Sequence, residues 1–433
     1  MRKNWIMPVV LSLCFALFPT WAQAEVRIGF IGPMTGVLAS FGKMMTEGVT
    51  LALEEVDYKV ADVPVRAIFE DNRLNPEQSV LRARKLAEQD NVHIITGLVS
   101  GSTGLAVHDW GSKTGMPLVF AYSAPEDITM RLATRNSVRP TWTGAQPMDP
   151  FGYWLATEKG MKRIYMIGQD YSFPHNQIGG LKRGFFRGGG EEIRTVWHPM
   201  GTDDFSSIFA RIPSSGFDAV LYAGAGSDGV AFMKQWVDFG MLGKIPLLGF
   251  SNTFEQTDLP AYPMAIADKG MMSAIQNADN LDTPEANRFR AAYLKRFGAL
   301  PSTVSEHAYM SMKIIIRALE NLKGDVSDRD KIITELRKKD VLEAPRGPVH
   351  LDDFANAVNT IYFREVKTNP AGGMWNVAIV KVENVSQFGP YDPQLYMKQP
   401  PDTRSYPPDT RDKMPKEMLD AKNPYKFITM PVK

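Results

Sequence analysis

The stretch that decides the fold is Val92–Pro117, which reads VHIITGLVSGSTGLAVHDWGSKTGMP. A short β-branched run is followed by a Gly/Ser-rich turn over Gly97–Gly104 and then by an amphipathic pattern from Leu105. This order predicts a strand, a polar turn and a helix. The first N–H groups of a helix have no partner inside it, so this turn, with the hydroxyls of Ser100 and Ser102, can hold a small anion such as a carboxylate. The same hydroxyls also suit simple helix capping, and this stretch alone leaves both interpretations open.

The first 24 residues have the pattern of a secretory signal peptide. Two basic residues precede the apolar run Trp5–Phe18, and the small residues Ala22-Gln23-Ala24 form a cleavage site. The apolar run is shorter than the roughly 20 residues of a membrane span. We therefore expect a soluble periplasmic protein that begins at Glu25. Cys14, the only cysteine, lies in the removed segment, so no disulfide or thiol chemistry is expected.

The composition limits the class of partner. Without Arg2 and Lys3, the chain carries 47 basic side chains against 48 acidic ones. Such a balance indicates neither a nucleic acid nor an anionic membrane surface as partner. A mature chain of roughly 400 residues is longer than one hydrophobic core usually serves, so two domains are expected.

Short β-like runs alternate with amphipathic helical patterns from Glu25 onward, which predicts a doubly wound α/β architecture. One such series precedes the polar segment Arg139–Pro150 and a second one follows it. Three helical patterns without strands and two further β-like runs come next. The Pro-rich tail from Gly389 is expected to wrap the surface or stay mobile. The expected strands are 26–31, 63–69, 93–96, 118–121, 163–167, 193–197, 219–223, 246–249, 360–366 and 375–382, and the expected helices are 41–56, 76–88, 101–112, 147–159, 176–186, 205–212, 227–239, 284–297, 302–323 and 329–339.

Three segments carry a family resemblance: VRIGFIGPMTGVLASFGKMMTEGVTLALEEVD over 26–57, EDNRLNPEQSVLRARKLAEQDNVHIITGLVSGSTG over 70–104, and MPLVFAYSAPEDIT over 116–129. Together they resemble the leucine/isoleucine/valine-binding family of periplasmic solute-binding proteins of ABC transporters. The resemblance implies a type I periplasmic binding protein fold, with two parallel-sheet lobes joined by three crossings and a ligand in the cleft. It implies one lobe from 25–144 plus 274–339 and another from 145–273 plus 340–389, and it leaves 390–433 as a tail without counterpart.

The same resemblance implies where the ligand binds. The carboxylate would rest on the turn around Ser100 and on the loop Ala121-Tyr122-Ser123, because loops after the carboxyl ends of parallel strands converge on one crevice. Aromatic residues would line the body of the site, and two loops of the second lobe would close the opposite wall. The expected ligand-binding residues are Phe41, Ser100, Ser102, Ala121, Tyr122, Ser123, Tyr171, Tyr222, Gly224, Ser251 and Glu255.

The sequence departs from the amino-acid-binding pattern at one point. Where such relatives carry a carboxylate for the α-ammonium group, this chain reads Phe250-Ser251-Asn252, and the nearest acid is Glu255. A buried ammonium without a partner is costly. We therefore expect a small carboxylate with an apolar or aromatic body, with branched-chain amino acids as the alternative.

Other chemistry has less support. Gly224–Gly229 is a formal G-x-G-x-x-G between a strand and a helix, but no acid stands about 20 residues further on to hold a ribose. An exported dinucleotide-binding oxidoreductase is therefore the less favoured reading, and no enzyme activity, cofactor or metal is expected. The preferred function is a monomeric solute-binding protein that delivers its ligand to an ABC permease, and a sensor that signals to a membrane receptor is the alternative.

Overall fold

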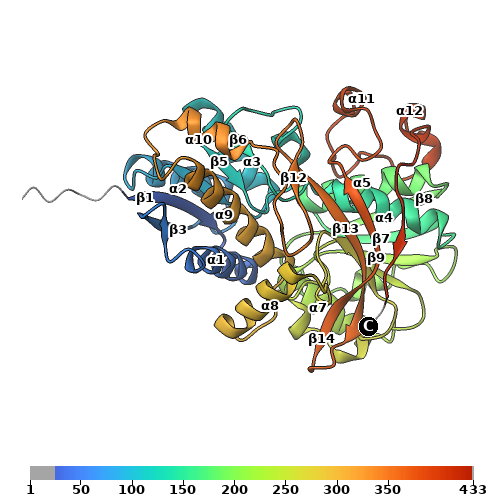
Figure 1. Cartoon of the computed structure of the whole chain (residues 1–433). Helices are drawn as coiled ribbons and strands as arrows, with labels where there is room; N and C mark the ends of the chain where they lie inside the picture. The colour runs from blue at the N-terminus through green and yellow to red at the C-terminus, as the bar shows by residue number, and fades with distance from the viewer. Residues whose placement is uncertain (1–24, 432–433) are drawn as a thin grey trace, which may run out of the picture.

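Two β-sheets organise the chain, as Figure 1 shows for the computed structural model, which describes residues 25–431. The predicted signal peptide, with Cys14, lies outside these residues. The six-stranded sheet has the order β2-β3-β1-β4-β5-β6, and the nine-stranded sheet has the order β15-β14-β13-β11-β10-β9-β7-β8, with β12 paired to β13. Because β1 pairs in parallel with β3 and β4, and β7 with β8 and β9, the predicted doubly wound α/β class is confirmed.

The first lobe is the six-stranded sheet with its helices. The α2 helix begins where the sequence predicted, because Asn75 Oδ1 accepts from the N–H of Gln78 at 2.9 Å and Pro76 suits the first turn. Its elements are β1 (Val26–Gly32), α1 (Ala39–Glu54), β2 (Lys59–Val60), β3 (Val63–Asp71), α2 (Pro76–Glu88), β4 (Ile94–Gly97), α3 (Gly101–Thr114), β5 (Leu118–Phe120), η1 (Glu126–Ile128), β6 (Ser137–Val138), α8 (Pro284–Phe297), α9 (Thr303–Asn321) and α10 (Arg329–Leu336).

Helices α1 and α9 pack closely on the first lobe. A Cβ atom at Gly48 would lie 2.1 Å from the carbonyl oxygen of Ser305, so only glycine fits this crossing. The side chains of Met312, Ile315 and Leu319 on α9 are fully buried. The late helices therefore complete the core of the sheet that the N-terminal third of the chain begins.

The second lobe is the nine-stranded sheet with its helices. Strand β11, which runs parallel to β10 and antiparallel to β13, was not predicted, because the apolar part of the sequence around it is too short to give a strand pattern. The elements of this lobe before the tail are α4 (Ala145–Thr157), β7 (Arg163–Gln169), α5 (Ser172–Arg187), β8 (Glu192–His198), α6 (Ser206–Phe209), β9 (Ala219–Ala223), α7 (Gly226–Asp238), β10 (Leu247–Gly249), η2 (Leu259–Ala261), η3 (Met264–Ile266), β11 (Met272–Ile275), β12 (His350–Leu351), β13 (Ala357–Thr368) and β14 (Met374–Val385).

The chain passes between the two sheets three times. The first passage joins β6 to α4 through 139–144, the second joins β11 to α8 through 276–283, and the third joins α10 to β12 through 337–349. The first and third passages are tied together, since Arg346 Nη2 donates to the Pro140 carbonyl at 2.7 Å. Arg139 of the first passage also donates from Nε to Asn356 Oδ1, in the turn between β12 and β13, at 2.7 Å. This is the connectivity that the resemblance implied.

The tail packs onto the second lobe and does not stand away from it. It contains α11 (Pro393–Lys398), η4 (Arg411–Lys413), α12 (Lys416–Leu419) and β15 (Ile428–Thr429), and β15 pairs antiparallel with β14. Figure 1 shows α11 and α12 in red above α5. The side chains of Tyr391, Tyr396 and Met418 are buried, so part of the tail belongs to the core.

Candidate ligand-binding site

A cavity of about 290 Å³ lies between the two lobes. Each lining residue comes from a segment that follows the carboxyl end of a parallel strand, which is where open α/β sheets bind ligands. The lining residues are Leu38, Phe41, Val99, Ser100 and Tyr122 of the first lobe, and Tyr171, Phe173, Ala225 and Asn252 of the second lobe.

Four helices begin at this cavity. Leu38, Ser100, Tyr171 and Ala225, which all line it, are the N-cap residues of α1, α3, α5 and α7. The N-terminus of a helix carries a partial positive charge and N–H groups without intrahelical partners. The electrostatics of the cavity therefore favour an anion.

The turn before α3 is held in a strained conformation. Gly97 has φ +104°, and a Cβ atom there would lie 2.3 Å from the Ile31 carbonyl oxygen, while Leu98 adopts φ +67°. Non-glycine residues rarely take positive φ, and such residues concentrate at functional sites. The turn places Ser100 at the cavity, and the Oγ of this serine accepts from the N–H of Thr103 at 3.2 Å. The capping role and the position at the cavity thus belong to the same serine.

Aromatic rings form most of the cavity wall. Phe41 meets Tyr122 edge to face at 6.1 Å between ring centroids, and Tyr171 lies 6.4 Å from Phe173. The Tyr122 hydroxyl makes no hydrogen bond of good geometry within the described residues. Burial, followed by the charge of Glu255, raises the pKa of Tyr122 well above its ordinary value, so its hydroxyl is a neutral donor. The cavity therefore combines apolar walls with a few polar groups.

Comparisons with known proteins agree with this geometry. A family model described as "periplasmic binding protein" matches residues 25–373. The chain belongs to this family. The Leu/Ile/Val-binding protein homolog 6 of Brucella melitensis is 28% identical over 382 residues, which cover 87% of this chain and 96% of the relative. The resemblance inferred from the sequence is thus confirmed.

Solved structures of this family are also similar. A solute-binding protein of an ABC transporter from Rhodopseudomonas palustris BisB5, in complex with 3,4-dihydroxybenzoic acid, has a TM-score of 0.78 and 26% identity over 84% of this chain and 98% of its own. Another from R. palustris, in complex with 4-hydroxybenzoate, has a TM-score of 0.77 and 27% identity over 84% and 99% of the two chains. Both of these relatives are solute-binding proteins of ABC transporters. None of the helices within residues 25–431 has the length and hydropathy that crossing a membrane requires.

The periplasmic binding protein cavity gathers part of the predicted site. Phe41, Ser100, Tyr122 and Tyr171 all line it. The other predicted residues, Ser102, Ala121, Ser123, Tyr222, Gly224, Ser251 and Glu255, are not among its lining residues.

Several of these other residues support the lining residues from behind. Ser123 Oγ donates to the Ser100 carbonyl at 3.0 Å and is fully buried, so it positions the α3 turn. Ser102 is exposed, with its Oγ 3.2 Å from Ser100 Oγ. Ser251 Oγ donates to the Ala274 carbonyl at 2.6 Å. A direct ligand contact by these three serines stays a prediction.

The acid that could have held an ammonium group is engaged elsewhere. Glu255 Oε1 lies 2.6 Å from Arg364 Nη2, and its Oε2 accepts from the N–H of Thr303, the first residue of α9, at 2.9 Å. A second acid, Asp258, accepts from the N–H of Gly226 at 2.6 Å, and burial raises its pKa to about 6. Neither acid lines the cavity.

The glycine-rich segment Gly224–Gly229 lies where the two lobes contact each other. Gly226 has φ +69°, and a Cβ atom there would lie 2.9 Å from the carbonyl oxygen of Val37 in the opposite lobe. Its N–H, which a dinucleotide fingerprint would offer to a pyrophosphate, is taken by Asp258. The segment therefore gives the oxidoreductase reading no structural support.

Five lining residues were not predicted: Leu38, Val99, Phe173, Ala225 and Asn252. All five lie within three residues of a predicted one, so the sequence identified the loops but not which residue of each loop lines the cavity. Asn252 is quoted in the segment that departs from the amino-acid pattern. That departure was the signal that could have placed it.

Proposed function

We propose that this protein is the extracytoplasmic, soluble solute-binding component of an ABC importer. It captures a small carboxylate with an apolar or aromatic body between its lobes and presents the ligand to the permease in the membrane. Export through the N-terminal signal sequence places it in the periplasm.

The observation that carries this proposal is the polarity of the cavity. The N-cap residues of four helices line it, and at three of them, α1, α3 and α5, no acidic side chain accepts from the first N–H of the helix, which favours a carboxylate. None of the nine described lining residues is acidic. The rings of Phe41, Tyr171 and Phe173 suit an apolar or aromatic body, because aromatic pairs contribute about 0.5–1.5 kcal/mol beyond area burial. An α-ammonium group would be buried there without a charged partner.

The comparisons support the same ligand class. Two R. palustris relatives at 26% and 27% identity are in complex with hydroxybenzoates. The name of the Brucella relative instead indicates leucine, isoleucine and valine, which keeps branched-chain amino acids as the second candidate. If Glu255 were to hold the ammonium group of such a ligand, its carboxylate would have to leave its ion pair with Arg364.

Calorimetric titration of the mature protein separates the two candidates. We expect benzoate, 4-hydroxybenzoate and phenylpropanoid acids to bind, and leucine and valine to bind much more weakly. Tight leucine binding that Glu255→Gln abolishes would overturn this ligand assignment. The same titrations therefore compare the affinity for carboxylates without an amino group with the affinity for branched-chain amino acids.

Ser100→Ala should lower the affinity for the bound carboxylate about 10-fold to 150-fold. The change removes one hydrogen bond to a charged oxygen, on the order of 1.5–3 kcal/mol. Ser112→Ala, at the far exposed end of α3, is the matched control and should leave affinity unchanged. Equal affinities for wild type and Ser100→Ala would place the carboxylate elsewhere.

Ligand should draw the two lobes together. We assign residues 25–144 plus 276–339 to one moving body and 145–275 plus 340–389 to the other, which keeps β11 whole in the second lobe. Hinge closure around a ligand is a known transition of two-lobed binding proteins, so the radius of gyration from X-ray scattering should fall at saturation. An unchanged radius with bound ligand would argue against closure.

A further inference from the structure

The C-terminal tail forms a fourth connection between the lobes, in addition to the three chain passages. Its residues 391–402 contact both helix α5 of the second lobe and the segment around η1 of the first lobe. Figure 1 shows α11 of the tail near the top of the view, and α8, which follows the second passage, near the bottom. The tail therefore crosses between the lobes far from the second passage.

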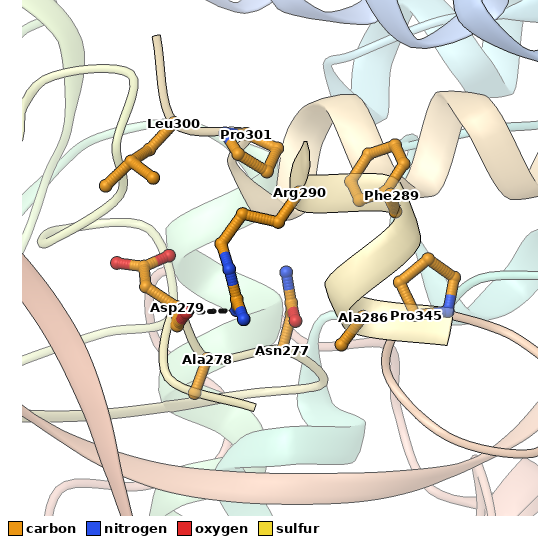
Figure 2. A pocket seen from close by; sticks show the side chains of 9 residues that line it. All are labelled: Asn277, Ala278, Asp279, Ala286, Phe289, Arg290, Leu300, Pro301 and Pro345. Carbon is orange, nitrogen blue, oxygen red and sulfur yellow. Dashed lines mark hydrogen bonds between the residues drawn. The ribbon is translucent and has the colours of Figure 1, made fainter. Parts of the chain in front are cut away.

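The second passage is fixed to both lobes. Arg290 Nη1 on α8 donates to the carbonyl oxygens of Asp279 at 2.7 Å and Leu281 at 3.1 Å, next to the small pocket that Figure 2 shows. The Asp279 carboxylate accepts from the N–H of Asn376 on β14 at 2.7 Å. In a hinge rotation the displacement grows with distance from the hinge, so a rotation of the lobes about this passage would displace the tail contacts strongly.

The tail binds the first lobe through two side chains, those of Arg131 and Glu126. Arg131 donates from Nε to the carbonyl oxygen of Met397 at 2.9 Å, and from Nη2 to those of Gln399 at 2.7 Å and Tyr396 at 3.2 Å. The Tyr396 hydroxyl donates to the Glu126 carboxylate. The side chain of Arg131 is 19% exposed, so water can replace its contacts when the lobes separate.

The same tail is held more firmly on the second lobe. Arg183, which is 4% exposed, forms two hydrogen bonds with the Asp402 carboxylate, at 2.5 and 2.9 Å. Lys182 Nζ donates to Asp409 Oδ1 at 2.7 Å and to the Pro407 carbonyl at 2.8 Å, and strand β15 pairs with β14. The tail therefore moves with the second lobe, and separation of the lobes would break its contacts with the first.

The two lobes also meet directly where the tail crosses. Arg183 Nη2 on α5 lies 3.3 Å from Glu126 Oε1 in η1. A Cβ atom at Gly101, the first residue of α3, would lie 2.5 Å from Ser172 Oγ, the first residue of α5. This arrangement, in which the η1 segment and α3 contact α5, is called the closed arrangement below.

We propose that residues 391–402 act as a strap that favours the closed arrangement of the lobes. The contacts of Arg131 and Tyr396 with their partners exist only while η1 and α5 stay together, so they stabilise the closed arrangement relative to an open one. The strap acts on the lobes whether or not a ligand is bound.

The strap also raises the affinity for the ligand without contacting it, and this second effect rests on the function proposed above. A protein that spends more of its time in the arrangement competent for binding has a higher apparent affinity. Closure on ligand binding then costs less than it would without the strap. The change in shape at saturation should accordingly be larger in a variant without the strap contacts.

The test is the interlobe distance in the ligand-free mature protein, measured by pulsed EPR. The only cysteine, Cys14, lies in the predicted signal peptide, so spin labels can be attached at Lys43→Cys on α1 and Lys234→Cys on α7, both exposed. Adding Arg131→Gln or Tyr396→Phe should lengthen the mean distance and broaden its distribution. Tyr396→Phe removes a single hydroxyl, so it keeps the test valid if Arg131→Gln fails to fold.

Lys182→Met is the matched control. It also removes hydrogen bonds to the tail, but these join the tail to the second lobe alone. It should leave the distance between the labels unchanged.

The affinity for 4-hydroxybenzoate is the second measurement. It should fall about 5-fold to 150-fold in Arg131→Gln, the usual range for coupling between two sites, and stay unchanged in Lys182→Met. A wild-type protein that does not bind 4-hydroxybenzoate would count against the proposed ligand, and the distance measurement would then decide on the strap by itself.

Three results would overturn the proposal. The first is a distance distribution that is the same in wild type, Arg131→Gln and Tyr396→Phe. The second is an equal lengthening in Lys182→Met, which would indicate that any loosening of the tail has this effect. The third is tighter binding of 4-hydroxybenzoate by Arg131→Gln, which would mean that the tail opposes closure.

Discussion

Replacing Arg183 with Met should lower the free energy of unfolding by about 3–5 kcal/mol, the cost of leaving buried charges without their partner. Arg183 on α5 is 4% exposed and forms two hydrogen bonds with Asp402 of the tail, Nη1–Oδ1 at 2.5 Å and Nη2–Oδ2 at 2.9 Å. Its Nη2 also lies 3.3 Å from Glu126 Oε1. Methionine keeps the apolar stem and removes the charge, so two buried carboxylates would face each other.

Denaturant unfolding of the mature protein measures this effect, with Arg404→Met as the matched control. Arg404 also joins the tail to the second lobe, through Asp170 at 2.8 Å, but it is 63% exposed. Exposed ion pairs contribute about 0–1 kcal/mol, so the control should change little. Similar small losses in both variants would show that the buried cluster does not stabilise the fold.

The buried cluster of Arg183, Asp402 and Glu126 holds the C-terminal tail against both lobes, although the tail lies outside the part of the chain that the family model matches. The match ends at residue 373, and Tyr396 in the tail donates its hydroxyl to Glu126, which follows β5 in the first lobe. Arg131 of the first lobe donates to the carbonyl oxygens of Met397 at 2.9 Å and Gln399 at 2.7 Å. The tail is therefore a structural part of the two-lobed body and not an appendage.

Local sequence patterns predicted the elements that local physics determines. Helix α2 begins at Pro76 because Asn75 caps it, and helix α8 has the predicted bounds because Thr283 caps it, with Oγ1 accepting from Ala286 N at 3.1 Å. Strand β11 was missed, since it is short and its pairing with β13 joins residues about 90 positions apart. The packing of the tail could not be predicted from the sequence either, because its buried residues are scattered through a Pro-rich segment.

The candidate site was predictable to the level of loops. The Gly/Ser-rich composition of the turn before α3 predicted a binding loop, and Ser100 of that loop lines the cavity. The state of Glu255 was not predictable, because its partner Arg364 lies on a strand more than 100 residues away. Sequence periodicity indicates which residues are buried, but it does not indicate which buried charges pair.

The pH dependence of the free energy of unfolding should show the protonation of the buried Glu126 carboxyl group. Burial, followed by the charge of Asp402, raises its pKa to about 7, although Arg183, Tyr396 and Arg131 face it and act in the opposite direction. The pKa in the unfolded chain is about 4.3, so the folded state binds more protons between these two values. The free energy of unfolding therefore falls as pH rises from about 4 to about 7, by about 4 kcal/mol for this group, and the stabilisation is complete below about pH 4.

Other buried acids also titrate, since burial raises the pKa of Asp402 and of Asp258. The measurement is therefore the difference between wild type and Glu126→Gln in denaturant unfolding at pH 5 and pH 8. Glutamine stays neutral and can still accept from the Tyr396 hydroxyl. We expect the two proteins to have similar stability at pH 5 and the variant to be the more stable at pH 8. A variant that is less stable than wild type at pH 8 would mean that Glu126 is ionised in the folded protein and held by Arg183.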